Sequence, residues 1–222
     1  MNLMKRALSL VLVCLMLATL CACGGKAKVL AARQEELCTG KWLTSCPDSP
    51  EEARYLLENI DMYEEEIALA DLNSLNYSVI FEFSPDGTYR QYLSVEHTKA
   101  DIRAFYEGAF RALFENRSVL SGIYETPLDS MDEAEFQLFY AGLYGSEDFS
   151  ALLNEFVDSA YDYKWEDLES GTYVLKNVNL LAVERVTSDP EAETSGTIPF
   201  TLKDGVLTLQ YSDGDAVYTH ID

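Results

Sequence analysis

The chain has 222 residues, with 16 Lys and Arg, 38 Asp and Glu, two His and five Cys, and a formal net charge of −22. An acidic chain without a basic run does not bind nucleic-acid phosphates through bulk electrostatics, so we expect no nucleic-acid partner. Two histidines are too few for a His-rich metal site. The 48% of hydrophobic and 12% of aromatic residues argue against disorder, and the length predicts one domain with room for an insertion.

The first residues are typical of a targeting signal. Lys5 and Arg6 precede an uncharged apolar stretch from Ala7 to Leu20, which is too short to span a bilayer as a stable helix. The next residues, Leu20-Cys21-Ala22-Cys23-Gly24, resemble the lipobox of bacterial lipoproteins. This resemblance implies that residues 1–22 are a signal peptide and that Cys23 carries a diacylglyceryl thioether, which would anchor the protein on the extracytoplasmic face of the cell membrane. An ordinary secretory signal is the alternative.

Processing changes the charge and cysteine counts. Removal of residues 1–22 takes away two basic residues and no acidic one, so the remaining 200 residues carry a net charge of −24. Only Cys38 and Cys46 would then be unmodified. The residues between them are typical of a strand, and eight steps of about 3.3 Å would hold the Cα atoms roughly 26 Å apart. A disulfide needs about 4.4–6.8 Å, so we expect free thiols unless the segment bends back.

The patterns in the first half predict a tether, strands and one helix: a tether or short helix at 23–37, a strand at 40–45, a helix from about 50 to 72, and strands at 77–83 and 88–93. Ser49 is the expected N-cap of the helix, with Pro50 in its first turn and Glu52 completing a capping box. Strict alternation of apolar and polar residues around the turn 84–87 predicts that the last two strands form a hairpin.

Three helices are expected in the middle of the chain. Thr98 is the predicted N-cap of the first helix, and Ser130 with Glu133 forms the predicted capping box of the second. Gly145 is the expected C-terminal stop of the second helix, and Ser146 is expected to open the third.

From residue 171 the apolar period returns to two and predicts five further strands: 172–175, 178–184, 198–202, 207–211 and 216–221. An acidic loop is expected at 186–196, and the turn 203–205 separates two of the last strands. About eight strands in mostly consecutive hairpins tend to curl and close, because closure removes the exposed edges. The pattern therefore predicts an α+β protein with an antiparallel β-barrel or strongly curved sheet.

Three motifs in order resemble lipocalin-like (calycin-type) domains of bacterial lipoproteins. Gly40-Lys41-Trp42 resembles the G-x-W motif of lipocalins, residues 83–89 resemble F-x-x-D-G-T-Y, and residues 202–209 resemble L-x-x-(D/N)-x-L-x-L. The resemblance covers roughly half of the mature chain. It implies a lipocalin-like domain at 38–222, interrupted by a helical insertion at about 98–163. Many such domains have no assigned activity, so the family suggests a fold more than a function.

A ligand would bind inside such a barrel. The candidate lining residues are large side chains predicted to point inward: Trp42, Tyr77, Phe81, Phe83, Phe200, Leu209 and Tyr211. All of them also fit a packed core. In lipocalins the matching Trp packs across one end of the barrel, which is the favoured role of Trp42.

Catalytic and metal-binding signals are weak. No motif typical of a hydrolase, a P-loop or a zinc site is present, and neither His97 nor His220 has a nucleophile at a motif spacing, so we expect a non-enzymatic protein without catalytic residues. We also expect no metal or cofactor. Asp213, Asp215 and the loop at 189–193 offer oxygen ligands for Ca²⁺, but no EF-hand loop exists and an acidic surface is the preferred interpretation.

Tyr140 and Tyr144 form a Y-x-x-x-Y pair of the kind that can ligate haem iron, but their spacing also suits packing on one helix face, which we favour.

The sequence thus indicates a membrane-anchored extracytoplasmic module that binds a small apolar ligand or an envelope protein partner. The alternatives are a structural lipoprotein with a filled barrel and, less favoured, a hydrolase. The partner hypothesis predicts an exposed apolar patch on the helices, made by aromatic residues in excess of one buried face: Phe105, Phe110, Phe114, Phe136 and Phe139. Nothing in the sequence indicates an oligomeric state.

Overall fold

The computed structural model describes residues 25–161, 167–186 and 195–222. The signal segment with Cys23 and most of the acidic loop, including 189–193, lie outside the described residues. The chain divides into two compact units. The barrel unit contains the described residues up to Trp42, Phe81–Arg90 and Glu169–Asp222, and the helical unit contains Leu43–Ile80 and the described part of Gln91–Leu168.

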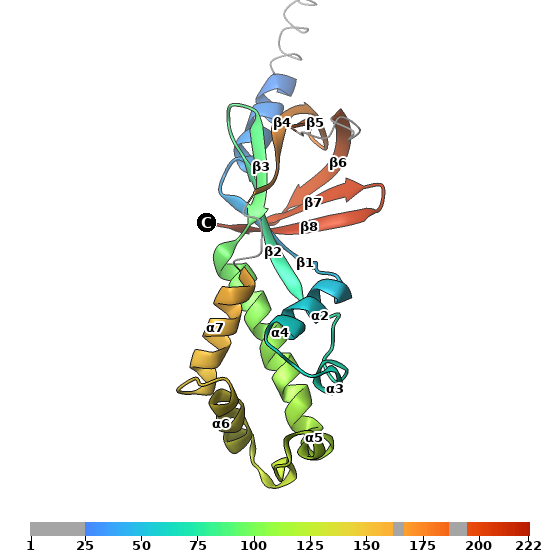
Figure 1. The fold of residues 1–222 in the computed structure, drawn as a ribbon. Helices are drawn as coiled ribbons and strands as arrows, with labels where there is room; N and C mark the ends of the chain where they lie inside the picture. Colours follow the sequence, from blue (N-terminus) through green and yellow to red (C-terminus); the bar gives the residue numbers. More distant parts are fainter. Residues whose placement is uncertain (1–24, 162–166, 187–194) are drawn as a thin grey trace, which may run out of the picture. The chain divides into compact units, whose positions relative to one another are not determined.

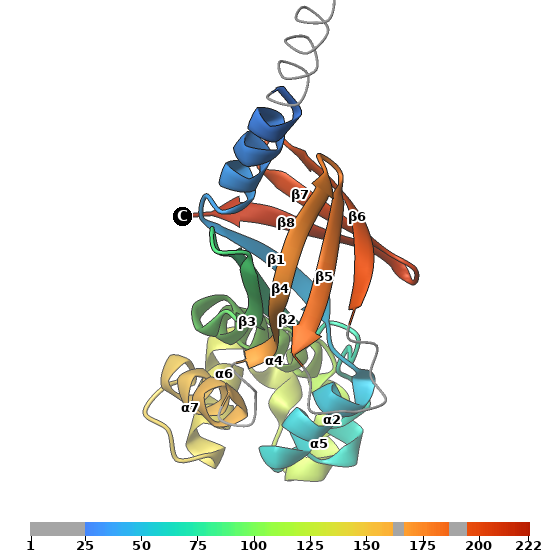
Figure 2. The same ribbon diagram turned by 90° about the horizontal axis from the view of Figure 1, so that it is seen from above.

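The expected α+β fold is confirmed. Of the two predicted forms, a barrel or a strongly curved sheet, the structure shows the barrel, because the eight strands form one closed antiparallel sheet in sequence order (Figures 1 and 2). The strands are β1 (Lys41–Pro47), β2 (Asn76–Phe83), β3 (Thr88–Leu93), β4 (Asp167–Asn177), β5 (Leu180–Val186), β6 (Ser195–Lys203), β7 (Val206–Tyr211) and β8 (Gly214–Ile221). The register places inward residues opposite one another, as in the pairs Phe200–Leu209 and Leu207–Tyr218.

The predicted turns form for identifiable chemical reasons. Between β2 and β3, Gly87 has φ +86° and the side chain of Asp86 accepts hydrogen bonds from the Thr88 backbone (3.0 Å) and hydroxyl (2.7 Å). Between β6 and β7, Asp204 and Gly205 have φ of +53° and +75°, the left-handed pair that a tight hairpin needs. These short connections make consecutive strands neighbours in the barrel.

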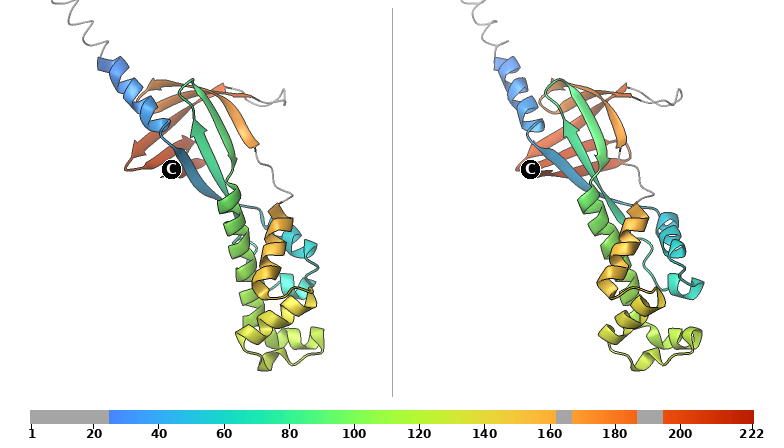
Figure 3. Two further views of the ribbon diagram at one scale, coloured as in Figure 1. Left: turned by 90° about the vertical axis from the view of Figure 1, so that its left-hand side faces the viewer. Right: turned by 60° about the vertical axis from the view of Figure 1, so that its left-hand side comes forward.

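Residues 25–37 form a helix, where the sequence predicted either a tether or a short helix. This helix leads into β1 (Figure 3). Cys38 and Cys46 are both free thiols. The expectation of unpaired cysteines is confirmed, because Lys41–Pro47 is an extended strand that does not bend back.

The helical unit contains six α-helices and one 3₁₀ turn among its described residues: α2 (Pro50–Asn59), α3 (Glu64–Ile67), α4 (Val95–Glu115), α5 (Arg117–Tyr124), η1 (Leu128–Ser130), α6 (Glu133–Leu143) and α7 (Phe149–Tyr161). Figure 3 shows α7 lying along α4. One buried cluster runs through all of these elements, including α2 and α3. The helices before β2 therefore share a core with those of the expected insertion.

The single helix expected from 50 to 72 is wrong, because the chain turns after Asn59. Ser49 caps α2 as predicted, accepting from the Glu52 backbone N–H at 3.1 Å. Asp61 then adopts φ +57°, and the Met62 N–H returns to the Leu57 carbonyl, which closes the helix. Glycine usually marks this left-handed position, so an aspartate there gave no stop signal.

The first long helix begins earlier than predicted. Its N-cap is Ser94, and Thr98 is a fully buried residue inside α4. The Thr98 hydroxyl accepts from the backbone N–H of Ser78 and donates to the Ser78 carbonyl, both at 3.2 Å. Thr98, which the sequence pattern predicts as a cap, thus joins α4 to β2. This contact is between residues far apart in the sequence, so the pattern of neighbouring residues does not predict it.

The caps of the later helices also differ from the prediction. Asp132, rather than Ser130, caps α6 and forms a reciprocal capping box with Glu135. At the start of α7 the side chain of Asp148, rather than that of Ser146, accepts from a backbone N–H, that of Ala151 at 2.8 Å. Gly145, with φ +73°, ends the turn after α6 as expected. Helix α5 was not predicted, although its apolar residues Val119, Leu120, Ile123 and Tyr124 recur at helical spacing.

Candidate functional site

The interior of the barrel is packed with side chains. Phe81 contacts the rings of Phe83 (centroids 4.4 Å apart), Tyr89 (5.2 Å) and Tyr218 (5.9 Å), and Phe83 contacts Tyr173 (5.0 Å). The predicted lining residues Phe81, Phe83, Phe200 and Leu209 are all at most 2% exposed in this cluster. Their packing favours the core role over the lining of an open pocket.

Trp42 is buried and belongs to the core cluster of the barrel unit. Its indole N–H donates to the Leu37 carbonyl at 2.9 Å, and its ring stands edge-on to His220 at 5.1 Å. Gly40 has φ +88°, and a Cβ there would lie 2.5 Å from the His220 ring nitrogen. The glycine and tryptophan of the G-x-W motif therefore join the N-terminal helix, β1 and β8, which is a structural role.

The other two predicted lining residues lie outside the buried barrel core. Tyr211 is half-buried beside it and borders a shallow cavity of about 270 Å³ on β5, β6 and β7. Tyr77 is half-buried in the helical unit and belongs to neither described buried cluster. A further groove of about 600 Å³ separates the helix at 25–37 from β4.

The expected exposed patch of five phenylalanines is wrong. Phe105, Phe110 and Phe136 are at most 3% exposed, and Phe114 and Phe139 are half-buried against the same cluster. Each of the packed helices buries an apolar face against its neighbours, and these aromatic side chains form part of that shared core. Exposed apolar side chains on α5 and α6 are instead aliphatic: Val119, Leu138 and Leu143.

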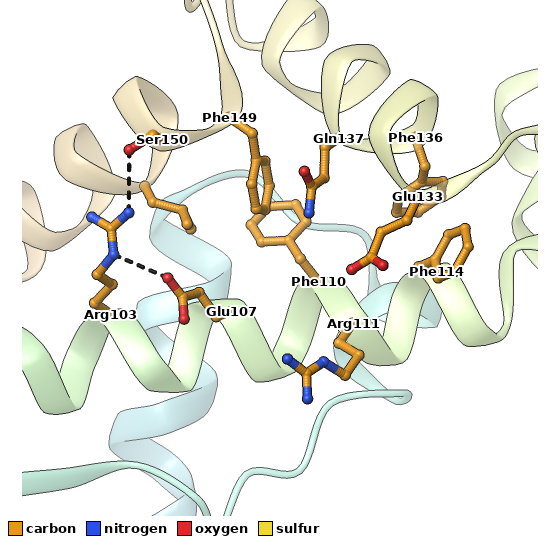
Figure 4. Close-up of a pocket in the computed structure, with 11 residues that line it drawn as sticks. Arg103, Glu107, Phe110, Arg111, Phe114, Glu133, Phe136, Gln137, Phe149 and Ser150 are labelled. Atoms are coloured by element: carbon orange, nitrogen blue, oxygen red, sulfur yellow. Dashed lines mark hydrogen bonds and ion pairs between the residues drawn. The ribbon is translucent and has the colours of Figure 1, made fainter.

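A cleft of about 330 Å³ lies between α4, α6 and α7 (Figure 4). Its floor is apolar and consists of Phe110, Phe114, Phe136, Phe149 and Leu153. Two edge-to-face ring pairs hold this floor, Phe110 with Phe149 at 5.1 Å and Phe114 with Phe136 at 5.5 Å. The volume falls at the lower end of the range typical of ligand sites, about 300–1,000 Å³.

One end of the cleft is held by Arg103 of α4. Its guanidinium pairs with Glu107 at 3.0 Å and donates to Asn154 at 2.6 Å and to Ser150 at 3.3 Å. Asn154 and Ser150 belong to α7, so this arginine bridges the two helices (Figure 4). The network fixes the distance between the walls at this end.

The other end carries Arg111, Glu133 and Gln137. Glu133 and Gln137 extend from α6 toward α4, and the side chain of Arg111 lies over α4 (Figure 4). Within the part of the chain that the structure describes, none of these three side chains has a hydrogen-bond or ion-pair partner. One cationic, one anionic and one amide group are thus available at this end.

Sequence reasoning missed the cleft, although part of it is visible in the sequence. Residues 103, 107, 110, 111 and 114 recur at intervals of three and four, which places charged and aromatic residues on one helix face. The contributions of α6 and α7 have no such local signal.

Tyr140 is committed to the core of the helical unit. Its hydroxyl donates to the fully buried Glu66 at 2.5 Å, and the hydroxyl of Tyr124 donates to the same oxygen at 2.7 Å. Burial raises the pKa of both tyrosines above its ordinary value, and the hydrogen bonds to Glu66 raise it further. Tyr144 packs edge-on to Phe156 at 5.0 Å, so the Y-x-x-x-Y pair forms packing contacts, as favoured.

His97 does have a serine partner, which the sequence did not reveal. The Ser94 hydroxyl lies 2.7 Å from His97 Nδ1, three residues later in the first turn of α4. Ser94 is 6% exposed, and neither residue lines any of the three cavities above. The pair therefore has the geometry of a local contact at a helix start rather than of a nucleophile exposed in a cleft.

Within the described residues, no cluster of three or more His, Cys, Asp or Glu side chains is arranged to hold a metal ion. No helix in that part of the chain combines the length and apolar character needed to cross a bilayer. Comparisons with protein-family models, curated proteins and solved structures found no match to this chain.

Proposed function

We propose that this protein is a lipid-anchored extracytoplasmic binding module that recognises a protein partner through the cleft of its helical unit. The observation that carries the proposal is the contrast between the two units. Aromatic packing fills the barrel core, whereas the helical unit has a cleft lined by both aromatic and polar side chains, three of which lack partners among the described residues. The filled core argues against a small apolar ligand inside the barrel and supports a scaffold role for it.

The anchor rests on the sequence. A basic start, an apolar stretch and the lipobox-like Leu20-Cys21-Ala22-Cys23 occur in the order that lipoprotein processing requires. Two acyl chains on Cys23 would hold the protein stably at the membrane, where one chain would be marginal. The lipocalin-like family assignment is part of the same proposal and is supported by the three motifs and the barrel topology.

The anchor is tested by Cys23→Ala in the full chain, with Cys21→Ala as the matched control. We expect Cys23→Ala to lose acyl labelling and to leave the membrane fraction, while Cys21→Ala keeps both. Unchanged fractionation of Cys23→Ala would refute the anchor.

The recognition site is tested by photo-crosslinking in intact cells. Ala134 is exposed and directly follows Glu133 at the cleft, whereas Thr201 is exposed on β6 of the barrel unit. A photo-reactive residue at position 134 should give a discrete protein adduct, and one at position 201 should not. Adducts of equal yield from both positions, or from neither, would contradict recognition through the cleft.

A further inference from the structure

The chemistry of the cleft restricts what can occupy it. A purely apolar ligand would cover Arg111, Glu133 and Gln137 without offering them hydrogen bonds, and desolvating such groups without partners is costly. A purely ionic ligand would not cover the exposed parts of Phe114 and Phe149, the two lining phenylalanines that are only half-buried. The occupant must therefore combine an apolar or aromatic group with polar groups of both charge signs.

At the end of the cleft that carries Arg111, Glu133 and Gln137, the two charges of opposite sign lie on different helices. Glu133 belongs to α6 and Arg111 to α4, so the anionic and cationic groups come from opposite walls, with Phe114 and Phe136 of the floor contributed by the same two helices. A ligand with charges complementary to these two residues would place its basic group beside Glu133 of α6 and its acidic group beside Arg111 of α4. Such complementarity selects partners and their orientation more than it adds affinity.

The size of the cleft indicates how much of a partner enters it. A volume of about 330 Å³ accommodates one or two large side chains rather than a folded element. Because Arg103 ties α4 to α7, these two walls are already positioned before anything binds.

We propose that the cleft binds a segment of a partner protein that presents an aromatic side chain between one acidic and one basic residue. This inference rests on the proposed function and names the chemistry of its partner. The aromatic ring lies on the phenylalanine floor, the acidic residue pairs with Arg111, and the basic residue pairs with Glu133. Gln137 exchanges hydrogen bonds with the backbone of the segment.

The test uses a library of random peptides displayed on phage, selected against the purified mature chain with Cys23→Ser in place of the lipid-carrying residue. We expect enrichment of peptides with an aromatic residue flanked by charges of opposite sign. Failure to enrich such a pattern would overturn the proposal.

The decisive comparison is the charge swap Arg111→Glu with Glu133→Arg, which conserves composition and net charge. A synthetic peptide of the selected sequence should bind this variant at least tenfold more weakly than the unaltered protein, and exchanging the two charged residues of the peptide should restore binding. The matched control, Lys28→Glu with Glu115→Arg, changes two exposed positions outside the cleft and should alter the Kd less than twofold. Circular dichroism confirms that each variant is folded.

Equal affinity of the selected peptide for the swap variant and the unaltered protein would refute the assigned roles of Arg111 and Glu133. If selection fails while the photo-crosslink at position 134 persists, the recognition site stands and the inferred partner chemistry is wrong. If both fail, the proposed function fails as well.

Discussion

Glu66 is the residue on which the helical unit depends most clearly. This fully buried carboxylate accepts hydrogen bonds from Tyr124, from Tyr140 and from the backbone N–H of Tyr63 at 2.9 Å. It therefore links α3 to α5 and α6, which are far apart in the sequence. A buried charge is tolerated only when such donors surround it.

Replacing this acceptor should be strongly destabilising. We expect Glu66→Ala to lower the free energy of unfolding by about 3–5 kcal/mol, because two tyrosine hydroxyls and one N–H lose their acceptor inside the core. The measurement is urea denaturation followed by circular dichroism. Tyr124→Phe, which removes one donor and leaves the carboxylate with two, should cost about 1–2 kcal/mol. A Glu66→Ala variant within about 0.5 kcal/mol of the unaltered protein would contradict this role.

At the scale of elements, hydrogen bonds at the chain turns decide where each helix begins and ends. Asp61 ends α2 in a left-handed conformation, and Asp132 starts α6 with a capping box. Aspartate serves both purposes here, whereas serine and glycine are the more familiar signals at these two positions. Sequence reasoning consequently recognised helix content better than helix boundaries.

The cap of α6 can be tested directly against the position that the sequence favoured. Asp132→Ala should lower the free energy of unfolding by about 1 kcal/mol, because the Glu135 N–H loses its acceptor at 2.9 Å. Ser130→Ala should cost less, since its hydroxyl donates to the exposed turn carbonyl of Pro127 and caps no helix. Chemical denaturation of both variants checks this, and a larger loss for Ser130→Ala than for Asp132→Ala would instead support Ser130 as the cap.

At the scale of the whole molecule, buried tyrosines make stability depend on alkaline pH. Desolvation raises the pKa of Tyr106 and Tyr140 above the ordinary value of about 10. Above that pH the unfolded chain releases tyrosine protons that the folded chain retains, so the free energy of unfolding falls as pH rises. Below it both states are protonated, and the contribution is fully present.

We expect stability measured by urea denaturation to decline between about pH 10 and pH 11.5. Each tyrosine held protonated adds about 1.4 kcal/mol per pH unit to the slope. Tyr106→Phe should reduce the slope by about one such contribution, because it removes one titrating hydroxyl and keeps the ring. Equal slopes for Tyr106→Phe and the unaltered protein would refute the assignment.

The strong negative charge, −22 over the whole chain, bears on solubility more than on recognition. At the cleft, the lining side chains include two arginines and two glutamates, so the site itself is locally balanced. The overall charge therefore does not describe the chemistry of the proposed partner.

The sequence by itself determined the antiparallel strands and their hairpins, because strand alternation and the turns at Asp86-Gly87 and Asp204-Gly205 are local signals that act over a few residues. It left open whether the sheet closes into a barrel or stays strongly curved, and the tertiary structure decided for closure. The sequence also predicted the free thiols of Cys38 and Cys46, which the structure confirms. Tertiary structure alone decided that Thr98 is a core residue, that the phenylalanines of the helices are buried, and that α4, α6 and α7 enclose a cleft. These outcomes depend on contacts between segments distant in the chain, which side-chain spacing within one segment does not specify.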